Sequence, residues 1–223
     1  MQAEGAVVPE RCRFLVVDDH PIFRHGVVAL IQSDPRYLVV AEAGSVGEAL
    51  AALEEHHPDM ALVDLSLGGQ NGLELLRSAR ERFPDVKVLV VSIHDETVYA
   101  DRVLKSGARG YLMKQAAGSD LKDAIRTVLA GKVYLSAAIK DQMLESLYRN
   151  QEPHRSLVSQ LSDRELEVLE HLGRGYGASE IAGRLGLSVK TVGVYQDHIK
   201  RKLALETASD LRRYAIQWLK EPG

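Results

Sequence analysis

The stretch Phe14-Leu-Val-Val-Asp-Asp19 decides the fold, because a short apolar run ends there in two adjacent carboxylates. Similar runs follow along the first half of the chain, and we expect strands at residues 14–17, 37–41, 60–63, 88–91 and 110–113. Short β-branched runs without alternation are typical of strands that are buried on both faces. Helical patterns lie between and after them, at residues 21–33, 45–57, 73–83, 97–106 and 119–130. Pro21 suits a first helical turn, and we expect Ser45 and Ser119 to act as N-caps. This repeat predicts an α/β fold with a doubly wound five-stranded parallel sheet.

Polar side chains end four of the five runs. Asp18 and Asp19 follow the first run, Asp64 the third, Ser92 the fourth and Lys114 the fifth. The carboxyl ends of parallel strands share one edge, where open α/β sheets bind their ligands, and we expect the flavodoxin-like strand order 2-1-3-4-5. Crowded carboxylates favour a cation, and Mg²⁺ prefers carboxylate oxygens while leaving positions for phosphate. These residue types predict phosphoryl transfer to Asp64, assisted by the charge of Lys114.

Length and composition narrow the possible classes of protein. The chain has 223 residues and a net charge of −3, which is enough sequence for two domains. Its sequence has no apolar stretch long enough for a membrane span, and residues 1–13 lack the pattern of a secretion signal. Its one cysteine, Cys12, cannot form an internal disulfide, so we expect a cytoplasmic protein. It also has no Walker-type nucleotide loop, so a phosphoprotein or an acyl phosphate is the expected phosphoryl donor.

Residues 12–131 resemble a response-regulator receiver domain of the NarL/FixJ type. The resemblance lies in Val17-Asp-Asp-His-Pro21, Leu62-Val-Asp-Leu65 and Gly107-Ala-Arg-Gly-Tyr-Leu-Met-Lys114. It implies that a sensor histidine kinase phosphorylates Asp64, so that the chain is not a turnover enzyme. It also implies a set of Mg²⁺ ligands, namely Asp18, Asp19, Asp64 and the backbone carbonyl of Ser66. The switch and phosphate-binding residues implied by the resemblance are Ser92, Tyr111 and Lys114.

Phosphorylation would then shift an existing equilibrium between inactive and active states. In that account, Ser92 moves toward the phosphoryl group and Tyr111 turns inward. His94 lies two residues beyond Ser92, where it could orient water and set the rate of dephosphorylation. The segment after Asp64 is rich in glycine, and we interpret Gly68 and Gly69 as a flexible turn rather than a phosphate-binding loop.

The pattern changes after residue 131. Residues 136–149 look helical, and the polar segment 150–156, which contains Pro153, predicts a linker. From residue 161 onward the pattern is helical throughout. We therefore expect a domain at residues 12–131, a helical linker at 132–158 and a small all-α domain at 159–223.

Capping residues divide the second domain into helices. Ser162 and Glu165 form a capping box that begins the first helix. Gly186 predicts the tight turn between a second helix, at residues 179–185, and a third, which Ser188 caps and which reaches about residue 203. Two helices joined by a short glycine turn are typical of a helix-turn-helix.

Residues 159–217 resemble a LuxR-type DNA-binding domain. The motifs that carry this resemblance are Leu161-Ser-Asp-Arg-Glu165, Glu180-Ile-Ala182, Leu185-Gly-Leu-Ser188, Lys190-Thr-Val192 and Arg201-Lys-Leu203. It implies that the third helix enters the major groove of double-stranded DNA at promoter half-sites. Helical spacing turns Val192, Tyr195, Ile199 and Leu203 toward the core. We expect DNA contacts from Lys190, Thr191, Val194, Asp197, His198, Arg201 and Lys202.

Three positions on the third helix depart from this resemblance. Relatives commonly have histidine at the position of Tyr195 and often a basic residue at Gly193 or Asp197. An aspartate near phosphates is repelled unless it accepts a hydrogen bond from a cytosine amino group. Residues 159–223 hold 10 Lys and Arg against 9 Asp and Glu, a net charge of only +1. Because DNA affinity depends largely on phosphate neutralisation, we expect weak binding by one chain and a homodimer, formed on phosphorylation or on DNA.

The last helical pattern offers a surface for dimerisation. Its apolar positions repeat with helical spacing at Leu211, Tyr214, Ala215, Trp218 and Leu219. Packing against the domain's own core accounts for part of this stripe.

Two other functions remain open from the sequence. A protein-interaction module would be phosphorylated on Asp64 without reading DNA, which the departures at Gly193 and Asp197 favour. A phosphatase with an aspartyl nucleophile would need a general acid two residues after Asp64, and Ser66 suits that role poorly. We therefore expect a DNA-binding response regulator that controls transcription.

Overall fold

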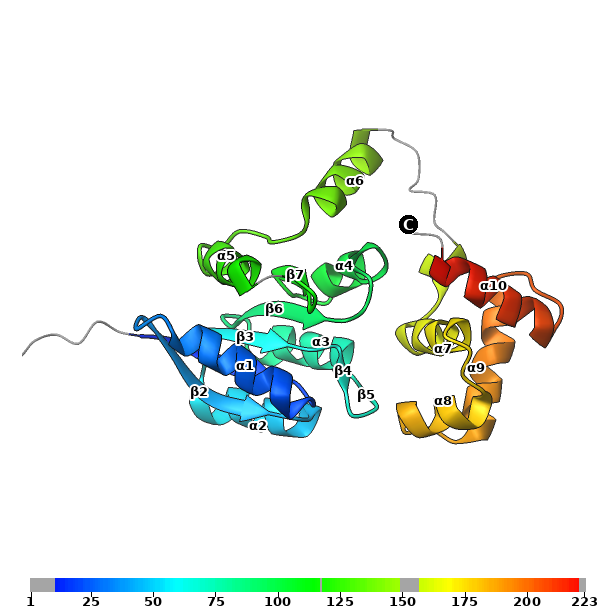
Figure 1. The fold of residues 1–223 in the computed structure, drawn as a ribbon, viewed down its shortest axis with the longest axis horizontal. Coiled ribbons are helices and arrows are strands. Elements are labelled where there is room, and N and C mark those ends of the chain that lie inside the picture. The colour runs from blue at the N-terminus through cyan, green and yellow to red at the C-terminus, as the bar shows by residue number, and fades with distance from the viewer. Residues whose placement is uncertain (1–10, 117, 149–156, 221–223) are drawn as a thin grey trace, which may run out of the picture.

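The computed structural model describes residues 11–116, 118–148 and 157–220. Its N-terminal domain contains a five-stranded parallel sheet, formed by β1 (Cys12–Val17), β2 (Tyr37–Ala43), β3 (Met60–Val63), β6 (Lys87–Ser92) and β7 (Gly110–Met113). Their spatial order is β2-β1-β3-β6-β7, which confirms the predicted order 2-1-3-4-5 (Figure 1). All the expected strands are present, although β1, β2 and β6 extend one or two residues beyond the predicted bounds.

Helices cover both faces of this sheet. Two of them, α1 (Pro21–Gln32) and α5 (Gly118–Leu129), lie on one face, and α2 (Val46–His56), α3 (Gly72–Arg82) and α4 (Glu96–Lys105) lie on the other (Figure 1). Neighbouring side chains of a strand point to opposite faces. Accordingly, Phe14 and Val16 pack with α1 and α5, whereas Leu15 and Val17 pack with α2, α3 and α4. Burial on both faces explains why the strand sequences are continuously apolar.

Most of the predicted helix starts are confirmed. Pro21 lies in the first turn of α1, and the side chain of Ser45 caps α2 by accepting a hydrogen bond from the backbone N–H of Glu48. The prediction that Ser119 caps α5 was wrong, because this helix begins at Gly118 and places Ser119 inside its first turn.

The segment after Asp64 is a β-hairpin. Its short strands are β4 (Ser66–Leu67) and β5 (Gln70–Asn71), and Gly68 and Gly69 connect them with φ angles of 57° and 84°. Two consecutive residues with positive φ are typical of the tightest hairpin turn, which strongly favours glycine. The turn that we interpreted as flexible is therefore part of a hydrogen-bonded hairpin, and the N–H of Gly68 donates to Asp19 Oδ2 at 2.8 Å.

The helix α6 (Ala137–Tyr148) and the single 3₁₀ turn η1 (Leu157–Gln160) lie between the two domains in the sequence, and the predicted linker at 150–156 falls outside the described residues. The C-terminal domain contains α7 (Asp163–Gly173), α8 (Ala178–Leu185), α9 (Val189–Lys202) and α10 (Ala208–Lys220). The predicted capping box of Ser162 and Glu165 is confirmed, and so is the cap formed by Ser188. Gly186 makes the turn between α8 and α9 with a φ of 64°.

Core packing accounts for most of the apolar stripe on α10. Leu211 and Ala215 are buried, and Tyr214 and Trp218 pack partly buried against the core of the same domain. Leu219 is 39% exposed, although its side chain also packs over Gly173 at the end of α7. A dimer surface on α10 would therefore be small and centred on the end of the helix.

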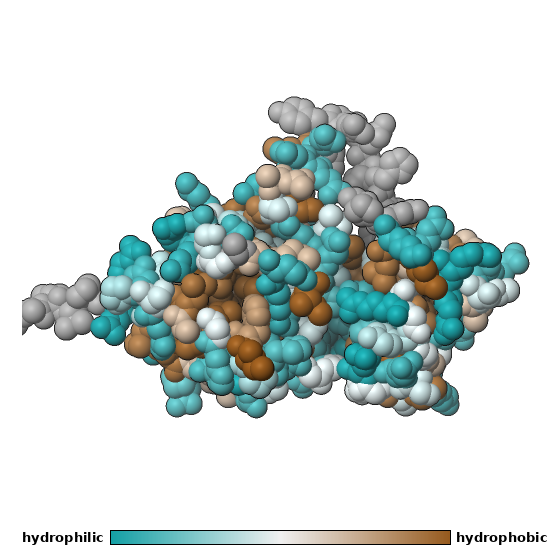
Figure 2. Space-filling view, in the orientation of Figure 1, coloured by the Kyte–Doolittle hydropathy of each residue, from teal (hydrophilic) through white to brown (hydrophobic). Residues whose placement is uncertain are grey.

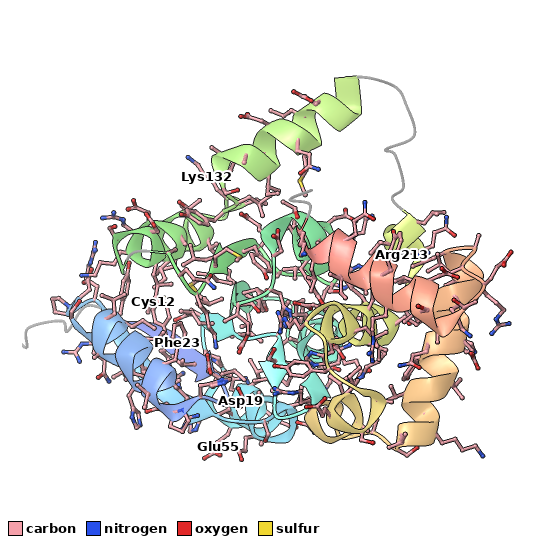
Figure 3. All side chains as sticks on the ribbon, turned by 45° about the vertical axis from the view of Figure 1, so that its right-hand side comes forward. Cys12, Asp19, Phe23, Glu55, Lys132 and Arg213 are labelled. Atoms are coloured by element: carbon pink, nitrogen blue, oxygen red, sulfur yellow. The ribbon has the colours of Figure 1, made fainter. Side chains whose placement is uncertain are left out.

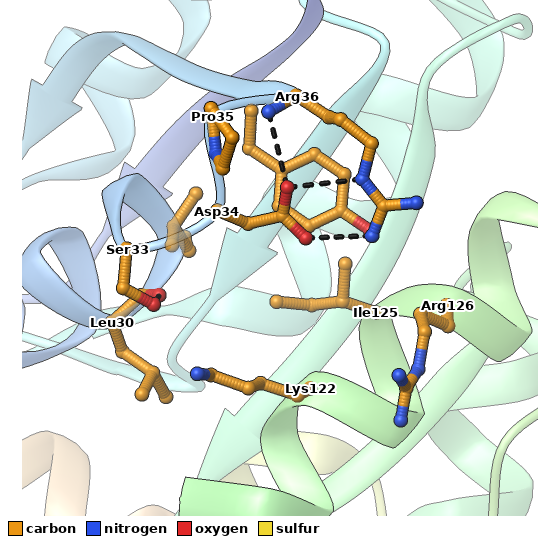
Figure 4. A pocket seen from close by; sticks show the side chains of 10 residues that line it. Leu30, Ser33, Asp34, Pro35, Arg36, Lys122, Ile125 and Arg126 are labelled. Atoms are coloured by element: carbon orange, nitrogen blue, oxygen red, sulfur yellow. Dashed lines mark hydrogen bonds and ion pairs between the residues drawn. The ribbon is translucent and has the colours of Figure 1, made fainter.

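A cavity of about 310 Å³ lies between the end of α1, the start of β2 and α5 (Figure 4). Its lining combines apolar side chains such as Leu30 and Ile125 with cations such as Lys122 and Arg36. Figure 2 shows hydrophobic residues gathered on the face where α1 and α5 lie. The Arg36 cation is paired with Asp34, with 2.6 Å between Nη2 and Oδ2.

In the described part of the chain, no helix has both the length and the apolar character needed to cross a bilayer.

Candidate functional site

The acidic residues predicted to form a site lie together at the carboxyl ends of β1 and β3. Ligand atoms of Asp18, Asp19, Asp64 and the neighbouring His20 all lie within 4.8 Å of one another. Asp18 and Asp64 are only 3% and 2% exposed, whereas Asp19, which Figure 3 labels, is partly exposed. His20 was not expected at this site, because its spacing in the sequence suggested no metal ligand, yet its Nδ1 is 2.7 Å from Asp19 Oδ1.

Lys114 joins two of these carboxylates. Its Nζ lies 2.7 Å from Asp18 Oδ2 and 2.7 Å from Asp64 Oδ2. Burial raises the pKa of Asp64, the Lys114 ammonium opposes this rise, and the Asp18 carboxylate adds to it. Burial alone would lower the pKa of Lys114, but the charges and hydrogen bonds of Asp64 and Asp18 outweigh burial and raise it. Phe23, which lies on α1 (Figure 3), packs against this lysine, with its ring centre 4.4 Å from Lys114 Nζ.

The acidic cluster fits a hard divalent cation. Asp64 Oδ1 is buried and has no hydrogen-bond partner among the described residues. A buried carboxylate oxygen without a partner is costly, and a cation or a protonated neighbour relieves that cost. Carboxylate oxygens are also the ligands that Mg²⁺ prefers.

Ser92 and Tyr111 lie deep in the same region. Both side chains are 0% exposed, and the hydroxyl of Tyr111 donates to the backbone carbonyl of His94 at 2.8 Å. Burial raises the pKa of Tyr111 far above its usual range. We expected Tyr111 to turn inward on phosphorylation, and in this structure its ring is already buried.

His94 connects the two domains. Its Nε2 lies 2.9 Å from Ser66 Oγ, and its Nδ1 lies 2.8 Å from Oε2 of Glu170 on α7. The hydroxyl of Tyr99 on α4 donates to the same Glu170 oxygen at 3.1 Å. Burial would raise the pKa of Glu170, but the hydrogen bond and charge of His94, with help from Arg174, outweigh it and lower the pKa. Sequence reasoning singled out His94 but not Glu170.

Further contacts hold α7 and α8 against the N-terminal domain (Figure 1). Asp163, the first residue of α7, pairs with Arg77 on α3, and its Oδ1 also accepts from Arg102 on α4 at 2.9 Å. Arg164 donates to the backbone carbonyl of Gly69 in the hairpin at 3.2 Å. A side chain at Gly69 would have its Cβ only 3.0 Å from the backbone of Leu185, at the end of α8. The hairpin therefore lies directly against the helix-turn-helix.

The outer face of α9 is exposed in this arrangement. The core side is as predicted, since Val192 and Ile199 are 0% exposed and Tyr195 is partly buried. The exposed members of the predicted DNA-contacting set are Lys190, Val194, Asp197, Arg201 and Lys202, and the half-buried members are Thr191 and His198.

Two of these predicted DNA contacts share one partner within the domain, Glu165 of α7. Lys202 Nζ lies 2.6 Å from Glu165 Oε2, and His198 Nδ1 lies 3.5 Å from Glu165 Oε1. Burial would raise the pKa of Glu165, but the hydrogen bonds from Lys202 and Ser162 outweigh it and lower the pKa. Glu165, which takes part in the capping box of α7, thus also binds side chains of the last turns of α9.

Comparison with protein families identifies the family of each domain. Residues 14–126 match the response regulator receiver domain, and residues 159–215 match the bacterial regulatory proteins of the luxR family. This chain is a LuxR-type response regulator. The match confirms the family that the sequence motifs indicated, and it makes the chain a DNA-binding transcription regulator of a two-component system.

Relatives of this response regulator match it along nearly its whole length. The oxygen regulatory protein NreC of Staphylococcus epidermidis is 36% identical over 211 residues, and that of Staphylococcus haemolyticus is 34% identical over 212 residues. Each alignment covers 92% of this chain and 97% of the relative.

Solved structures agree with this assignment. A LuxR-family two-component response regulator from Aurantimonas sp. SI85-9A1 is 36% identical with a TM-score of 0.58, covering 62% of this chain and 99% of that one. RcsB from Salmonella typhimurium is 25% identical with a TM-score of 0.66, covering 93% of this chain and 98% of that one. RcsB in a DNA complex is 25% identical with a TM-score of 0.56, covering 92% and 97% of the two chains.

Proposed function

We propose that this response regulator accepts a phosphoryl group on Asp64 from a sensor histidine kinase. The observation that supports this most directly is the Lys114 ammonium, which is 2.7 Å from an oxygen of Asp18 and of Asp64. The other Asp64 oxygen, Oδ1, has no hydrogen-bond partner among the described residues, so its lone pairs are available for attack. In the transfer, Oδ1 bonds to phosphorus as the phosphorus–nitrogen bond of the phosphohistidine breaks, and the nitrogen keeps the electron pair. A protein that accepts one phosphoryl group for each signal acts as a switch, not as an enzyme with multiple turnovers.

A metal site and a set of switch residues complete this proposal. The residues that would hold Mg²⁺ are Asp18, Asp19, Asp64 and the backbone carbonyl of Ser66. A bound Mg²⁺ supplies positive charge that stabilises the oxygens of the group in transfer. Lys114 would then bind a phosphoryl oxygen and Ser92 would donate a hydrogen bond to another, while Tyr111 stays packed behind Ser92.

We further propose that α9 contacts double-stranded DNA through Lys190, Thr191, Val194, Asp197, His198, Arg201 and Lys202. The helix carries four cations and one anion, a net charge of +3, although the domain as a whole is nearly neutral. Lys202 and Lys200 are paired with Glu165 and Asp197, so Lys190 and Arg201 carry most of the positive charge that can neutralise phosphates. A homodimer on two promoter half-sites would double a contact that is weak for one chain.

Phosphoryl uptake tests the acceptor assignment. Full-length wild type, Asp64→Asn and the control Asp85→Asn, which changes an exposed carboxylate of the same domain, are incubated with acetyl phosphate and Mg²⁺. We expect the wild type and Asp85→Asn to carry a phosphoryl group that alkali and hydroxylamine release, and Asp64→Asn to carry none. Uptake by Asp64→Asn at the wild-type rate contradicts the assignment.

Salt dependence separates DNA reading from a protein-interaction role. Binding of the full chain to genomic fragments is measured at several salt concentrations, for the wild type and Lys190→Ala. We expect affinity to fall with salt, and the slope against log salt to drop by about one unit in Lys190→Ala. Retention that does not respond to salt favours the interaction module instead.

A further inference from the structure

The imidazole of His20 lies beside the acidic cluster rather than capping its own helix. His20 is the N-cap residue of α1, but its side chain makes no capping hydrogen bond. Its backbone is extended, with φ −95° and ψ 101°, which the following Pro21 favours. The backbone N–H of His20 donates to Asp18 Oδ1 at 2.8 Å. These local features hold the ring next to the aspartates at the end of β1.

The ring nitrogen of His20 approaches two carboxylate oxygens. Its Nδ1 lies 2.7 Å from Asp19 Oδ1 and 3.4 Å from Asp18 Oδ1. The shorter contact is not aligned as a hydrogen bond, and Asp19 Oδ1 has no hydrogen-bond partner within the described part of the chain. Neighbouring ligand atoms of one metal ion lie about 3 Å apart, since each is about 2.1 Å from the ion. The nitrogen and the two oxygens are therefore spaced like ligands of one ion.

Asp64 supplies a second, independent sign of a bound cation. Its side chain is 1% exposed, and its Oδ1 is buried without a hydrogen-bond partner among the residues that the structure describes. The other oxygens do have partners, because Asp19 Oδ2 accepts from the N–H of Gly68 at 2.8 Å and Asp64 Oδ2 lies 2.7 Å from Lys114 Nζ. A buried oxygen without a partner is costly, and a cation relieves that cost. His20 belongs to the group of residues whose ligand atoms all lie within 4.8 Å of one another.

We infer that His20 supplies a nitrogen ligand to the cation held by this cluster, so that the site binds a divalent transition metal such as Co²⁺ more tightly than Mg²⁺. Imidazole is a common ligand of transition metals, whereas Mg²⁺ takes oxygen ligands and keeps several of its waters. Mg²⁺ therefore binds through oxygen atoms alone, and a transition metal gains the nitrogen as well. This inference rests on the metal site of the proposed function and adds a ligand to it.

An indirect role for His20 leads to a different expectation. If the imidazole only oriented Asp19, its removal would change the affinity for every divalent cation by a similar factor. A nitrogen ligand makes the effect depend on the metal. The ratio of the Co²⁺ and Mg²⁺ dissociation constants, measured on the same variant, therefore separates the two roles.

The experiment titrates the full chain with Co²⁺ or Mg²⁺ in a calorimeter and records its proton NMR spectrum with equimolar Co²⁺. A histidine ring bound to high-spin Co²⁺ gives signals far outside the usual spectral range. His20→Ala should fold, because this side chain is 63% exposed. We expect it to weaken Co²⁺ binding on the order of tenfold or more, to change Mg²⁺ affinity by less than about twofold, and to abolish the shifted ring signals.

Two further variants sharpen the comparison. His20→Asn keeps a polar side chain at this position but offers an amide oxygen, so it should lose Co²⁺ affinity and keep or gain Mg²⁺ affinity. His25→Ala removes another exposed histidine of α1 and is the matched control, which should bind both cations as the wild type does.

Four outcomes overturn the inference. One is a wild type that binds Mg²⁺ as tightly as Co²⁺, and another is an equal change in both affinities in His20→Ala. The others are shifted ring signals that persist in His20→Ala or that disappear in His25→Ala. Failure of the proposed function looks different, because Asp64→Asn then binds both cations like the wild type and the wild type takes up no phosphoryl group on Asp64.

Discussion

The Lys114 ammonium bridges two buried carboxylates, and its removal should destabilise the receiver in a way that depends on pH and Mg²⁺. The side chains of Lys114, Asp18 and Asp64 are 8%, 4% and 1% exposed, so Lys114→Met leaves two like charges together with little water. Removing one partner from a buried ion pair costs about 3–5 kcal/mol. One carboxylate can take up a proton instead of staying charged, so we expect the lower end, about 3 kcal/mol, at pH 7.

The sign of the pH dependence follows from the raised pKa of Asp64. A carboxyl whose pKa is higher in the folded than in the unfolded chain stabilises the folded chain when protonated, and this contribution is lost as the pH rises through that interval. Without Lys114 the folded pKa rises further, so the defect of Lys114→Met should shrink from pH 7 to pH 5. Mg²⁺ should also reduce it, since a ligand at about 100 times its dissociation constant adds about 2.7 kcal/mol.

Differential scanning calorimetry of the full chain at both pH values, with EDTA or with Mg²⁺, measures this effect. A loss of about 3 kcal/mol lowers the melting temperature of the receiver by roughly 10 °C. Lys132→Met, which changes an exposed lysine directly after the receiver, is the control (Figure 3). A melting temperature that falls equally at pH 5 and pH 7, and equally with and without Mg²⁺, refutes the reasoning.

Other predictions concern the DNA-binding domain. Gly173→Ala should destabilise it by about 1–3 kcal/mol in Trp fluorescence melts, because the new Cβ would lie 2.5 Å from the carbonyl of Ala215. Gly183→Ala, with nothing within 4 Å, should instead stabilise α8 by up to about 1 kcal/mol, and equal effects of the two changes would contradict the packing argument. Burial lowers the pKa of His171 from 6.5 to about 4, so stability should fall as the pH drops through that interval, by about 1–2 kcal/mol after allowing for partial exposure. His171→Gln should flatten this fall in urea titrations, and an unchanged slope would exclude His171 as its source. Asp197→Asn should raise affinity for all duplexes alike in gel-shift titrations, whereas a loss confined to sites with one particular cytosine would mean that Asp197 reads that base.

The fold could be predicted because its determinants are local. Each buried strand is a short apolar run, and each run ends in the residue that the site uses, so the sequence order of Asp18, Asp64, Ser92 and Lys114 already implies one edge of a sheet. The failure at Ser119 is local too. A serine that caps a helix and a serine inside its first turn look alike in the sequence. Helix ends are therefore uncertain by a residue or two.

The interdomain contact could not be predicted in the same way. His94 and Glu170 are 76 positions apart, and neither carries a local signal for the other. On α7, Glu170 stands four residues before Arg174, which is the usual pattern of an exposed helical ion pair. Only the packing of one domain against the other turns that carboxylate inward. The sequence did single out His94, two residues after Ser92, but it did not indicate a contact with the second domain.

The docked receiver touches α7, α8 and the turn after α8, yet it leaves the outward residues of α9, such as Val194 at 45% exposure, open to solvent. These outward side chains of α9 are therefore accessible in the docked arrangement itself. What a signal can alter is the freedom of the helix-turn-helix to pivot about its own receiver. Control of a promoter would then depend on whether two copies can be spaced to match adjacent half-sites. It would not depend on exposing a buried recognition helix.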